Sequence, residues 1–419
     1  MRLTTGNSVA IVVACSVAAC VNPQVPIVDH PPAPDRFARA ASQDPQARAS
    51  AADELVGDPT FSAVQMLNTL LVRDIDPAVR AHAADAIAAR HDPDLEGMLE
   101  NAAHADPDPR VRQAAEQARQ RLWPWGKSPG KAAALSIIGL GQFYLRDNQA
   151  GTAYLLTTGA LVGSGLALVA NHDVSIDGPS DSAKVPLGLG LATAGQNLLF
   201  YGIFDSYRDA RVLRGDAGYS FHITHESLDE LALAPFNPSV LKSPWVWGGV
   251  PAALAFGLGA SILIDKIDGS DTQGRPTIFD VKKVNVFGHK FNRGAGFAAG
   301  AGYFGALFGT VGVGEESLFR GVIQTEMEER FGTVPGLVLG SVIFGSVHTL
   351  NFVDDPKQAL YAVPVITVVG TTLGLAYQHT GHQLKTGVAM HFWYDTLLSL
   401  AAFAIDPDHQ PFVVNYSMP

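Results

Sequence analysis

Two adjacent carboxylates and an arginine stand inside an apolar part of the chain, in the run Glu315-Glu316-Ser317-Leu318-Phe319-Arg320. Ionisable groups are costly in such surroundings, so their presence there points to a function. Glu316 and Arg320 are four residues apart, so on a helix they share a face and are expected to form an ion pair. Glu315 lies about 100° around the same helix, outside that pair, and is free to act as a general base.

Two histidines follow in later apolar segments. His348 ends the run Phe344-Gly345-Ser346-Val347-His348, and His391 begins the run His391-Phe392-Trp393-Tyr394-Asp395. His391 and Asp395 are also four residues apart, so Asp395 is expected to accept a hydrogen bond from the imidazole and to fix its tautomer.

One carboxylate and two histidines on three separate helices could activate a water molecule. They could act directly, as a general base and polarising groups. Alternatively, Glu315, His348 and His391 could bind a divalent metal such as zinc that keeps an open position. The sequence has no His-Glu-x-x-His zinc motif. Both routes predict a hydrolytic site made of Glu315, His348, His391 and Asp395, with Glu316 and Arg320 as its support.

The elements that must position these residues are apolar helices. From about Lys131 onward, Gly, Ala and Leu dominate successive segments, and a membrane-spanning helix needs about 20 residues. The fold class is therefore an all-α, polytopic helical membrane bundle. About eight spans are expected, near Ala132–Leu145, Thr152–Ala170, Pro186–Phe204, Trp245–Ile264, Gly294–Val313, Val334–Leu350, Leu360–Tyr377 and Gly387–Ala404.

The composition agrees with a membrane body. Charged residues make up 16% of the 419 residues and hydrophobic residues 47%, whereas ordinary soluble domains have about 25% charged residues. The net charge of −11 argues against a nucleic-acid partner. Both cysteines, Cys15 and Cys20, lie in the first 20 residues, so the folded body has no disulfide and no cysteine-based zinc site.

Residues 1–20 are expected to be a lipoprotein-type signal peptide. The apolar run Ser8–Val21 is short for a span, and Val17-Ala18-Ala19-Cys20 resembles a bacterial lipobox, which would make Cys20 the lipidated first residue of the mature chain. An ordinary signal peptide or an uncleaved anchor is the alternative. The Pro-rich residues 21–35 then form an extended tether. This pattern predicts an exported, lipid-anchored N-terminal domain at a bacterial inner membrane.

A repeat fills the next part of the chain. The pattern Asp-Pro-x-x-Arg begins at Asp44, Asp76 and Asp108, at a spacing of 32 residues. Asp followed by Pro suits the first residues of a helix, and Ala-rich sequence follows each pair. Residues 36–122 are therefore expected to form a small α-solenoid of HEAT-like helix pairs that binds a protein partner or acts as a spacer. A plain Ala-rich bundle is the alternative.

The three catalytic motifs, in their order along successive membrane helices, resemble those of the CAAX protease and bacteriocin-processing family (CPBP, or Abi). The resemblance covers roughly residues 245–405 and implies a domain at 244–406, preceded by membrane helices and a polar loop at 131–243. It implies an intramembrane endopeptidase in which Glu315 activates water with His348, and His391 stabilises the transition state or binds metal. The family often has Asn where this chain has Asp395, and an ionised Asp cannot donate to an oxyanion as Asn does.

Two other functions remain open. The chain could be a non-catalytic membrane scaffold whose repeats bind a partner, or a transporter that uses Glu315, His348 and His391 as a proton relay. Membrane orientation stays undecided because the basic residues of the loops Asp205–Ser243 and Asp265–Arg293 oppose one another. The substrate is a peptide or protein, and no prenyl-binding feature singles out a prenylated CAAX peptide.

Overall fold

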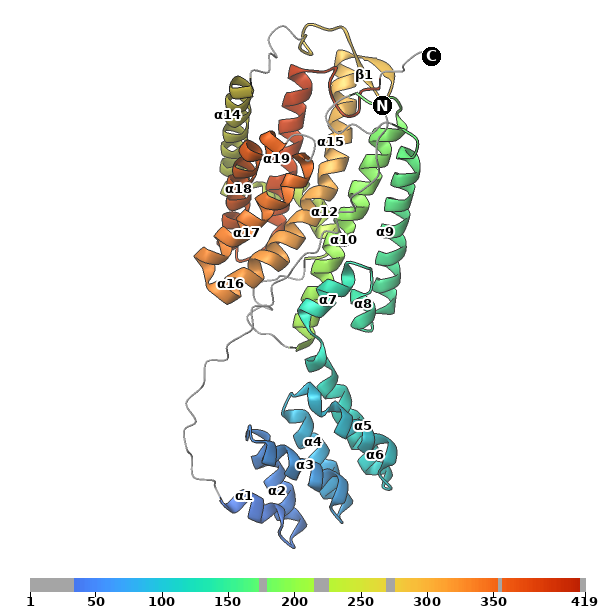
Figure 1. Ribbon diagram of the computed structural model, residues 1–419, viewed down its shortest axis with the longest axis vertical. Helices are drawn as coiled ribbons and strands as arrows, with labels where there is room; N and C mark the ends of the chain where they lie inside the picture. Colours follow the sequence, from blue (N-terminus) through green and yellow to red (C-terminus); the bar gives the residue numbers. More distant parts are fainter. Residues whose placement is uncertain (1–33, 173–178, 215–225, 269–275, 353–355, 415–419) are drawn as a thin grey trace, which may run out of the picture. The chain divides into compact units, whose positions relative to one another are not determined.

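The computed structural model describes residues 34–172, 179–214, 226–268, 276–352 and 356–414 (Figure 1). The chain divides into two compact units. One contains residues up to Arg90 together with Met98–Glu116, and the other contains His91–Gly97 and the residues from Gln117 onward. The predicted signal peptide, its lipidation site Cys20 and nearly all of the predicted tether lie outside the described residues.

The N-terminal helices begin where the sequence predicts. Each of the three Asp-Pro pairs starts a helix, and the Asp carboxylate accepts the backbone N–H two residues further on, from Gln46, Ala78 or Arg110. This contact satisfies one of the free donors of the first helical turn. The helices are α1 (Pro34–Ala40), α2 (Pro45–Val56), α3 (Phe61–Arg73), α4 (Pro77–Ala89), α5 (Glu96–Ala105) and α6 (Pro109–Leu122).

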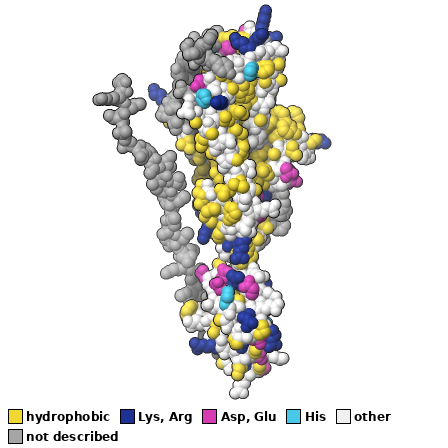
Figure 2. Space-filling view, turned by 90° about the vertical axis from the view of Figure 1, so that its right-hand side faces the viewer, with side chains coloured by type: hydrophobic (Ala, Val, Ile, Leu, Met, Phe, Trp, Pro, Cys, Tyr) yellow, Lys and Arg dark blue, Asp and Glu magenta, His cyan; other side chains and the backbone are white. Residues whose placement is uncertain are grey.

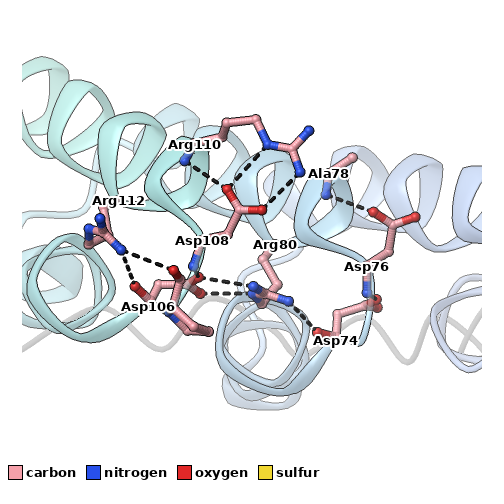
Figure 3. A network of polar contacts seen from close by, with 9 residues as sticks. Asp74, Asp76, Ala78, Arg80, Asp106, Asp108, Arg110 and Arg112 are labelled. Atoms are coloured by element: carbon pink, nitrogen blue, oxygen red, sulfur yellow. Dashed lines mark hydrogen bonds and ion pairs between the residues drawn. The ribbon is translucent and has the colours of Figure 1, made fainter.

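Arginine–aspartate pairs join consecutive repeats (Figure 3). Arg80 donates two hydrogen bonds to Asp106, of 2.8 and 2.9 Å, and a third to the Asp74 carbonyl. Arg48 makes the same two-bond contact with the Asp74 carboxylate. Although burial favours the neutral acid, the facing guanidinium holds the pKa of Asp74 and of Asp106 below the usual value. The repeated Arg of the motif is thus a link between repeats, which the sequence alone did not reveal.

The second unit is a helical body. Its first helices are α7 (Pro129–Ser136), α8 (Gly141–Tyr144), α9 (Asn148–Val169) and α10 (Lys184–Arg214). Short elements follow: α12 (Leu228–Leu233), α13 (Pro238–Leu241), the π-helical η4 (Trp245–Gly249) and α14 (Val250–Asp268). The last helices are α15 (Arg293–Glu316), the π-helical η5 (Ser317–Gln324), α16 (Thr325–Phe331), α17 (Thr333–Val347), the 3-10 helix η6 (His348–Phe352), α18 (Pro356–His379) and α19 (Leu384–Ile405).

Six helical stretches among the described residues are long and apolar enough to cross a membrane, and a shorter apolar one runs over Trp245–Ala260. Exposed apolar side chains cover much of the visible face of this body (Figure 2). The all-α membrane bundle is therefore confirmed, with fewer spans than the eight expected. The six stretches are Asn148–Val169, Lys184–Arg214, Arg293–Phe331, Thr333–Phe352, Lys357–His379 and Leu384–Ile405.

The predicted span Ala132–Leu145 is wrong. Its residues form the two short helices α7 and α8, which are separated at Gly139, a glycine with φ of +76°. Gly tolerates this left-handed conformation, whereas other residues resist it. The polar side chains within the segment are buried against α10, where Ser136 contacts Ser206 and Gln142 donates to Asp205. Tertiary polar contacts therefore fold the segment back.

A small cap closes one end of α15 and α19. Strands β1 (Lys283–Val286) and β2 (His289–Asn292) form an antiparallel hairpin, with Lys283 opposite Asn292. Its apolar side packs with aromatic residues of both helices and with Phe412. In the body below, α15 lies between α10 and α19, and α17 pairs with α18. These five helices surround the predicted site residues.

Candidate active site

Glu315 and Glu316 are the last residues of α15, at the point where the chain passes into π-helical η5. π-helical turns are rare and occur frequently at functional sites. The expected ion pair is present, with Arg320 Nη1 3.3 Å from Glu316 Oε1 and both side chains at most 2% exposed. Glu315 stands outside this pair, as the helical spacing predicts.

His391 lies on α19 and contacts acids through both ring nitrogens. Its Nδ1 donates to Glu316 Oε1 at 2.9 Å, because a carboxylate oxygen only accepts. Its Nε2 lies 3.2 Å from Asp395 Oδ2. Glu316, which the sequence assigned only to Arg320, therefore also orients the imidazole. Spacing within one helix could not reveal this bond, because it joins α15 to α19.

The side chains of His348 and His391 both lie close to the carboxylate of Glu315. Glu315 Oε2 lies 3.7 Å from His348 Nε2 and 3.8 Å from His391 Nε2. Both separations are too long for direct hydrogen bonds, but each is short enough for a water molecule to bridge the glutamate and that histidine. Glu315 Oε2 is buried and has no hydrogen-bond partner within the described part of the chain. The structure therefore brings the three residues together around an unsatisfied acceptor.

The tautomer of His348 follows from its second contact. The Nδ1 atom donates to the Phe344 carbonyl at 2.7 Å. A neutral imidazole with a hydrogen on Nδ1 has a lone pair on Nε2. The Nε2 atom that faces Glu315 can therefore accept a hydrogen bond from water.

Arg320 and Phe344 form the floor beneath the histidines. Arg320 Nη2 donates to the Gly370 carbonyl at 2.8 Å, and its guanidinium lies 4.4 Å from the centre of the Phe344 ring. That ring also contacts His348 and His391. The Phe344 ring thus packs against both site histidines and against the guanidinium of the supporting arginine.

Close contact between α19 and α15 depends on Gly387. A Cβ atom at this position would lie 2.7 Å from Glu316 Oε2, which is closer than real Cβ contacts allow. The absent side chain lets the buried carboxylate fit beside α19, one turn before His391. Gly387 is therefore part of the geometry that places His391 on Glu316.

A cavity of about 460 Å³ opens onto the three residues. Side chains from α10, α15, α17, η6, α18 and α19 line it, so it reaches beyond the helices that carry the motifs. Asn197 on α10 and Tyr394 on α19 are among its walls, and neither was predicted from the sequence as a site residue. The signal that could have found Asn197 is the pair of amides Gln196-Asn197 within a largely apolar span. The lining includes Thr193, Asn197, Phe308, Val311, Glu315, His348, Asn351, Val369, His391, Tyr394 and Asp395.

The donor types at the site suit zinc, but their arrangement does not. Zinc ligands lie about 2.0–2.2 Å from the ion. Among the described residues, no group of three or more His, Cys, Asp or Glu side chains has an arrangement that could hold a metal ion. Asp395 also lies against the Nε2 atom that His391 would need for coordination. The residues as placed therefore do not fit the metal route, and the chemistry below uses side chains alone.

Two parts of the chain match known families. Residues 298–397 match the family described as Type II CAAX prenyl endopeptidase Rce1-like, a CPBP family. Residues 33–119 match the family of HEAT repeats. Comparison with curated proteins and with solved structures gives no match. The chain therefore carries a CPBP-family segment in its C-terminal part, which includes all six predicted site residues, and HEAT repeats in its N-terminal part.

Proposed function

We propose that this multi-pass membrane protein is an endopeptidase that hydrolyses a peptide bond inside the membrane. The observation that carries the proposal is that His348 and His391 both lie within 4 Å of the buried, unpartnered Oε2 atom of Glu315. The family match supports the same class of reaction, because its description is that of an endopeptidase.

In the proposed reaction, Glu315 takes a proton from the water, and the water oxygen attacks the carbonyl carbon of the substrate. His348 Nε2 accepts a hydrogen bond from the second O–H of that water, which stays on the oxygen, and so directs an oxygen lone pair toward the carbon. The proton held by Glu315 then passes to the amide nitrogen as the C–N bond breaks. The products are one new carboxyl terminus and one new amino terminus, so no redox partner is required.

His391 is assigned to the oxyanion of the tetrahedral intermediate. An N–H at Nε2 would donate to this oxygen, while Glu316 holds the ring at Nδ1. Asp395 stands beside the same Nε2 and would stabilise a doubly protonated ring. This assignment gives Asp395 an electrostatic role through His391 in place of the direct donation that an Asn offers.

The N-terminal part of the chain is assigned from its sequence pattern and its family match. We propose that Cys20 is lipidated, that residues 36–122 bind a protein partner close to the membrane, and that the protein resides in a bacterial inner membrane. These proposals rest on the lipobox-like run and on the HEAT match. Mass spectrometry of the mature N-terminus tests the lipidation directly.

The test of the proteolytic function uses the full chain in lipid nanodiscs and a set of probe peptides. The set contains a farnesylated CAAX peptide, its unprenylated counterpart and a mixture of membrane-spanning peptides, all incubated in H₂¹⁸O. Hydrolysis places ¹⁸O in the new carboxyl terminus, which mass spectrometry detects. The prenylated and unprenylated arms separate the substrate classes.

Glu315→Gln and His348→Ala are expected to abolish ¹⁸O incorporation. His379→Ala is the matched control, because this histidine also ends a membrane helix but lies away from the cavity, against Trp245. Cleavage that persists in both site variants would overturn the proteolytic assignment. Function that survives these substitutions but not the loss of residues 36–122 would support the scaffold, and ion flux in proteoliposomes would support the proton relay.

A further inference from the structure

Asn197 lies in the middle of α10 with its side-chain amide buried. The amide nitrogen has a hydrogen-bond partner, but the amide oxygen has none among the described residues. The side chain is 4% exposed. Its Nδ2 donates to the Thr193 carbonyl at 2.9 Å. A carbonyl oxygen only accepts, so the nitrogen must face Thr193 and Oδ1 must point away from it. That Oδ1 has no hydrogen-bond partner among the residues that the structure describes.

The position of this oxygen ties it to the proposed catalytic group. A Cβ atom built on Gly314 would lie 2.4 Å from Asn197 Oδ1. The amide therefore lies directly against the backbone of the residue that precedes Glu315. Asn197 also lines the cavity that contains Glu315, His348 and His391.

A second cavity adjoins the first at the same residue. It measures about 450 Å³, and apart from Asn197 its walls are almost entirely apolar, with Leu198, Tyr201, Gly309 and Phe392 among them. Asn197 is thus shared by a polar cavity with the proposed catalytic residues and an apolar cavity on the other side of α15. Asn197 is therefore a wall residue of both cavities, and its unpartnered oxygen is buried beside Gly314.

A buried acceptor without a partner is costly, and in native proteins it usually has a ligand or a water molecule as its donor. A peptide entering this site supplies donors of the required kind. Its scissile bond must leave helical geometry to be attacked, so backbone N–H groups beside that bond lose their helical partners inside an apolar region. A protein acceptor that replaces those partners lowers the cost of unwinding.

We propose, on the basis of the proposed peptidase function, that Asn197 is a substrate-binding residue. Its Oδ1 accepts a hydrogen bond from a main-chain N–H of the peptide next to the scissile bond. The adjoining cavity receives the neighbouring side chain, so the substrate class is a peptide with an apolar residue beside the cleaved bond. Asn197 forms no covalent bond and transfers no proton in the reaction.

The test replaces one N–H of the substrate at a time. The most readily cleaved probe peptide from the nanodisc assay is remade with single ester linkages at each bond near, but not at, the cleavage site. An ester removes the N–H donor and keeps the chain length. KM and kcat are measured for each peptide with the wild-type chain and with Asn197→Ala, which gives a double-mutant cycle.

One ester position is expected to raise KM about 3- to 10-fold in the wild-type chain, the range for one neutral hydrogen bond. The same ester is expected to change KM less than 2-fold in Asn197→Ala, while esters elsewhere affect both chains equally. If the alanine variant folds poorly, Asn197→Leu takes its place, because leucine keeps the size of the side chain and removes the acceptor. Equal effects in both chains at every position, including the case in which Oδ1 binds only water, would overturn the proposal.

The two proposals fail in different ways. A wild-type chain that cleaves no probe, or a Glu315→Gln chain that still cleaves, overturns the peptidase function and this inference with it. A wild-type chain that cleaves and loses activity with Glu315→Gln, but shows no coupling to Asn197, overturns the inference alone.

Discussion

The adjacent glutamates at the end of α15 are expected to differ in what the same substitution changes: activity at Glu315 and stability at Glu316. Glu315→Gln removes a proposed general base, so kcat should fall by about 10²- to 10⁴-fold with little change in stability. Glu316→Gln removes the charge that faces Arg320 in a pair at most 2% exposed. Breaking such a buried pair costs about 3–5 kcal/mol, because the remaining charge stays buried.

Stability can be followed as the temperature at which the detergent-solubilised full chain loses its monodisperse elution peak. A change of 1 kcal/mol shifts this midpoint by about 2–4 °C in domains of about 150–250 residues. Glu316→Gln should therefore lower it by roughly 6 °C or more, while Glu315→Gln leaves it within about 2 °C. An equal fall of the midpoint in Glu315→Gln and Glu316→Gln would contradict the different roles assigned to the two glutamates.

Three further predictions address the apolar cavity and the repeats. Gly309→Leu should fill the apolar cavity, since a Cβ there meets nothing within 4 Å, and should raise KM about 10-fold for substrates with a bulky apolar residue beside the cleaved bond. Arg80→Ala should cost the repeats about 2–4 kcal/mol, because it leaves Asp106 buried without its guanidinium, and should speed amide hydrogen exchange in α4 and α5. The lowered pKa values of Asp74 and Asp106 mean that their contribution is present above the unfolded-state value of about 3.9 and is lost as pH falls through the lower folded-state values. The protection factors of the repeat amides, which compare the measured exchange rate with the intrinsic rate at the same pH, should therefore fall only below about pH 4.

Matched variants control these experiments. Gly302→Leu adds the same side chain to α15, also in open space, at a residue that does not line the cavity, so an equal rise in KM would contradict the cavity-filling argument. Arg110→Ala removes a pair with Asp108 whose arginine is 78% exposed, and it should destabilise the repeats much less than Arg80→Ala does. A fall in the protection factors of the repeat amides already between pH 7 and 5 would contradict the assigned role of the aspartates.

Local chemistry explains which features were predictable from sequence. The helix starts at Asp44, Asp76 and Asp108 follow from cap contacts within three residues, so no tertiary information was needed. The separation of Glu315 from the Glu316–Arg320 pair follows from helical geometry alone. The motifs could also be placed on successive helices from their apolar surroundings.

Contacts between helices explain the rest. The bond from His391 to Glu316 joins residues 75 positions apart, and nothing in either motif encodes it. Asn197 belongs to no motif, and only the packing of α10 against α15 brings it to Glu315. The failed span at Ala132–Leu145 has the same cause, since an apolar average concealed Ser136 and Gln142, whose partners lie on α10.

The arginine–aspartate pairs between repeats also determine which changes of length the repeat region can accommodate. At each of the two junctions an arginine of one repeat pairs with an aspartate of the next, so a block of 32 residues could be gained or lost between them while every internal pair is preserved. The first repeat has Ser42 where the later ones have Asp74 and Asp106. Ser42 still accepts the Asp44 N–H and shapes the turn, but it has no charge to offer. Arg112, the last arginine of the series, donates instead to the backbone carbonyls of Asp106 and Pro107, so the charged pairing is confined to the two internal junctions.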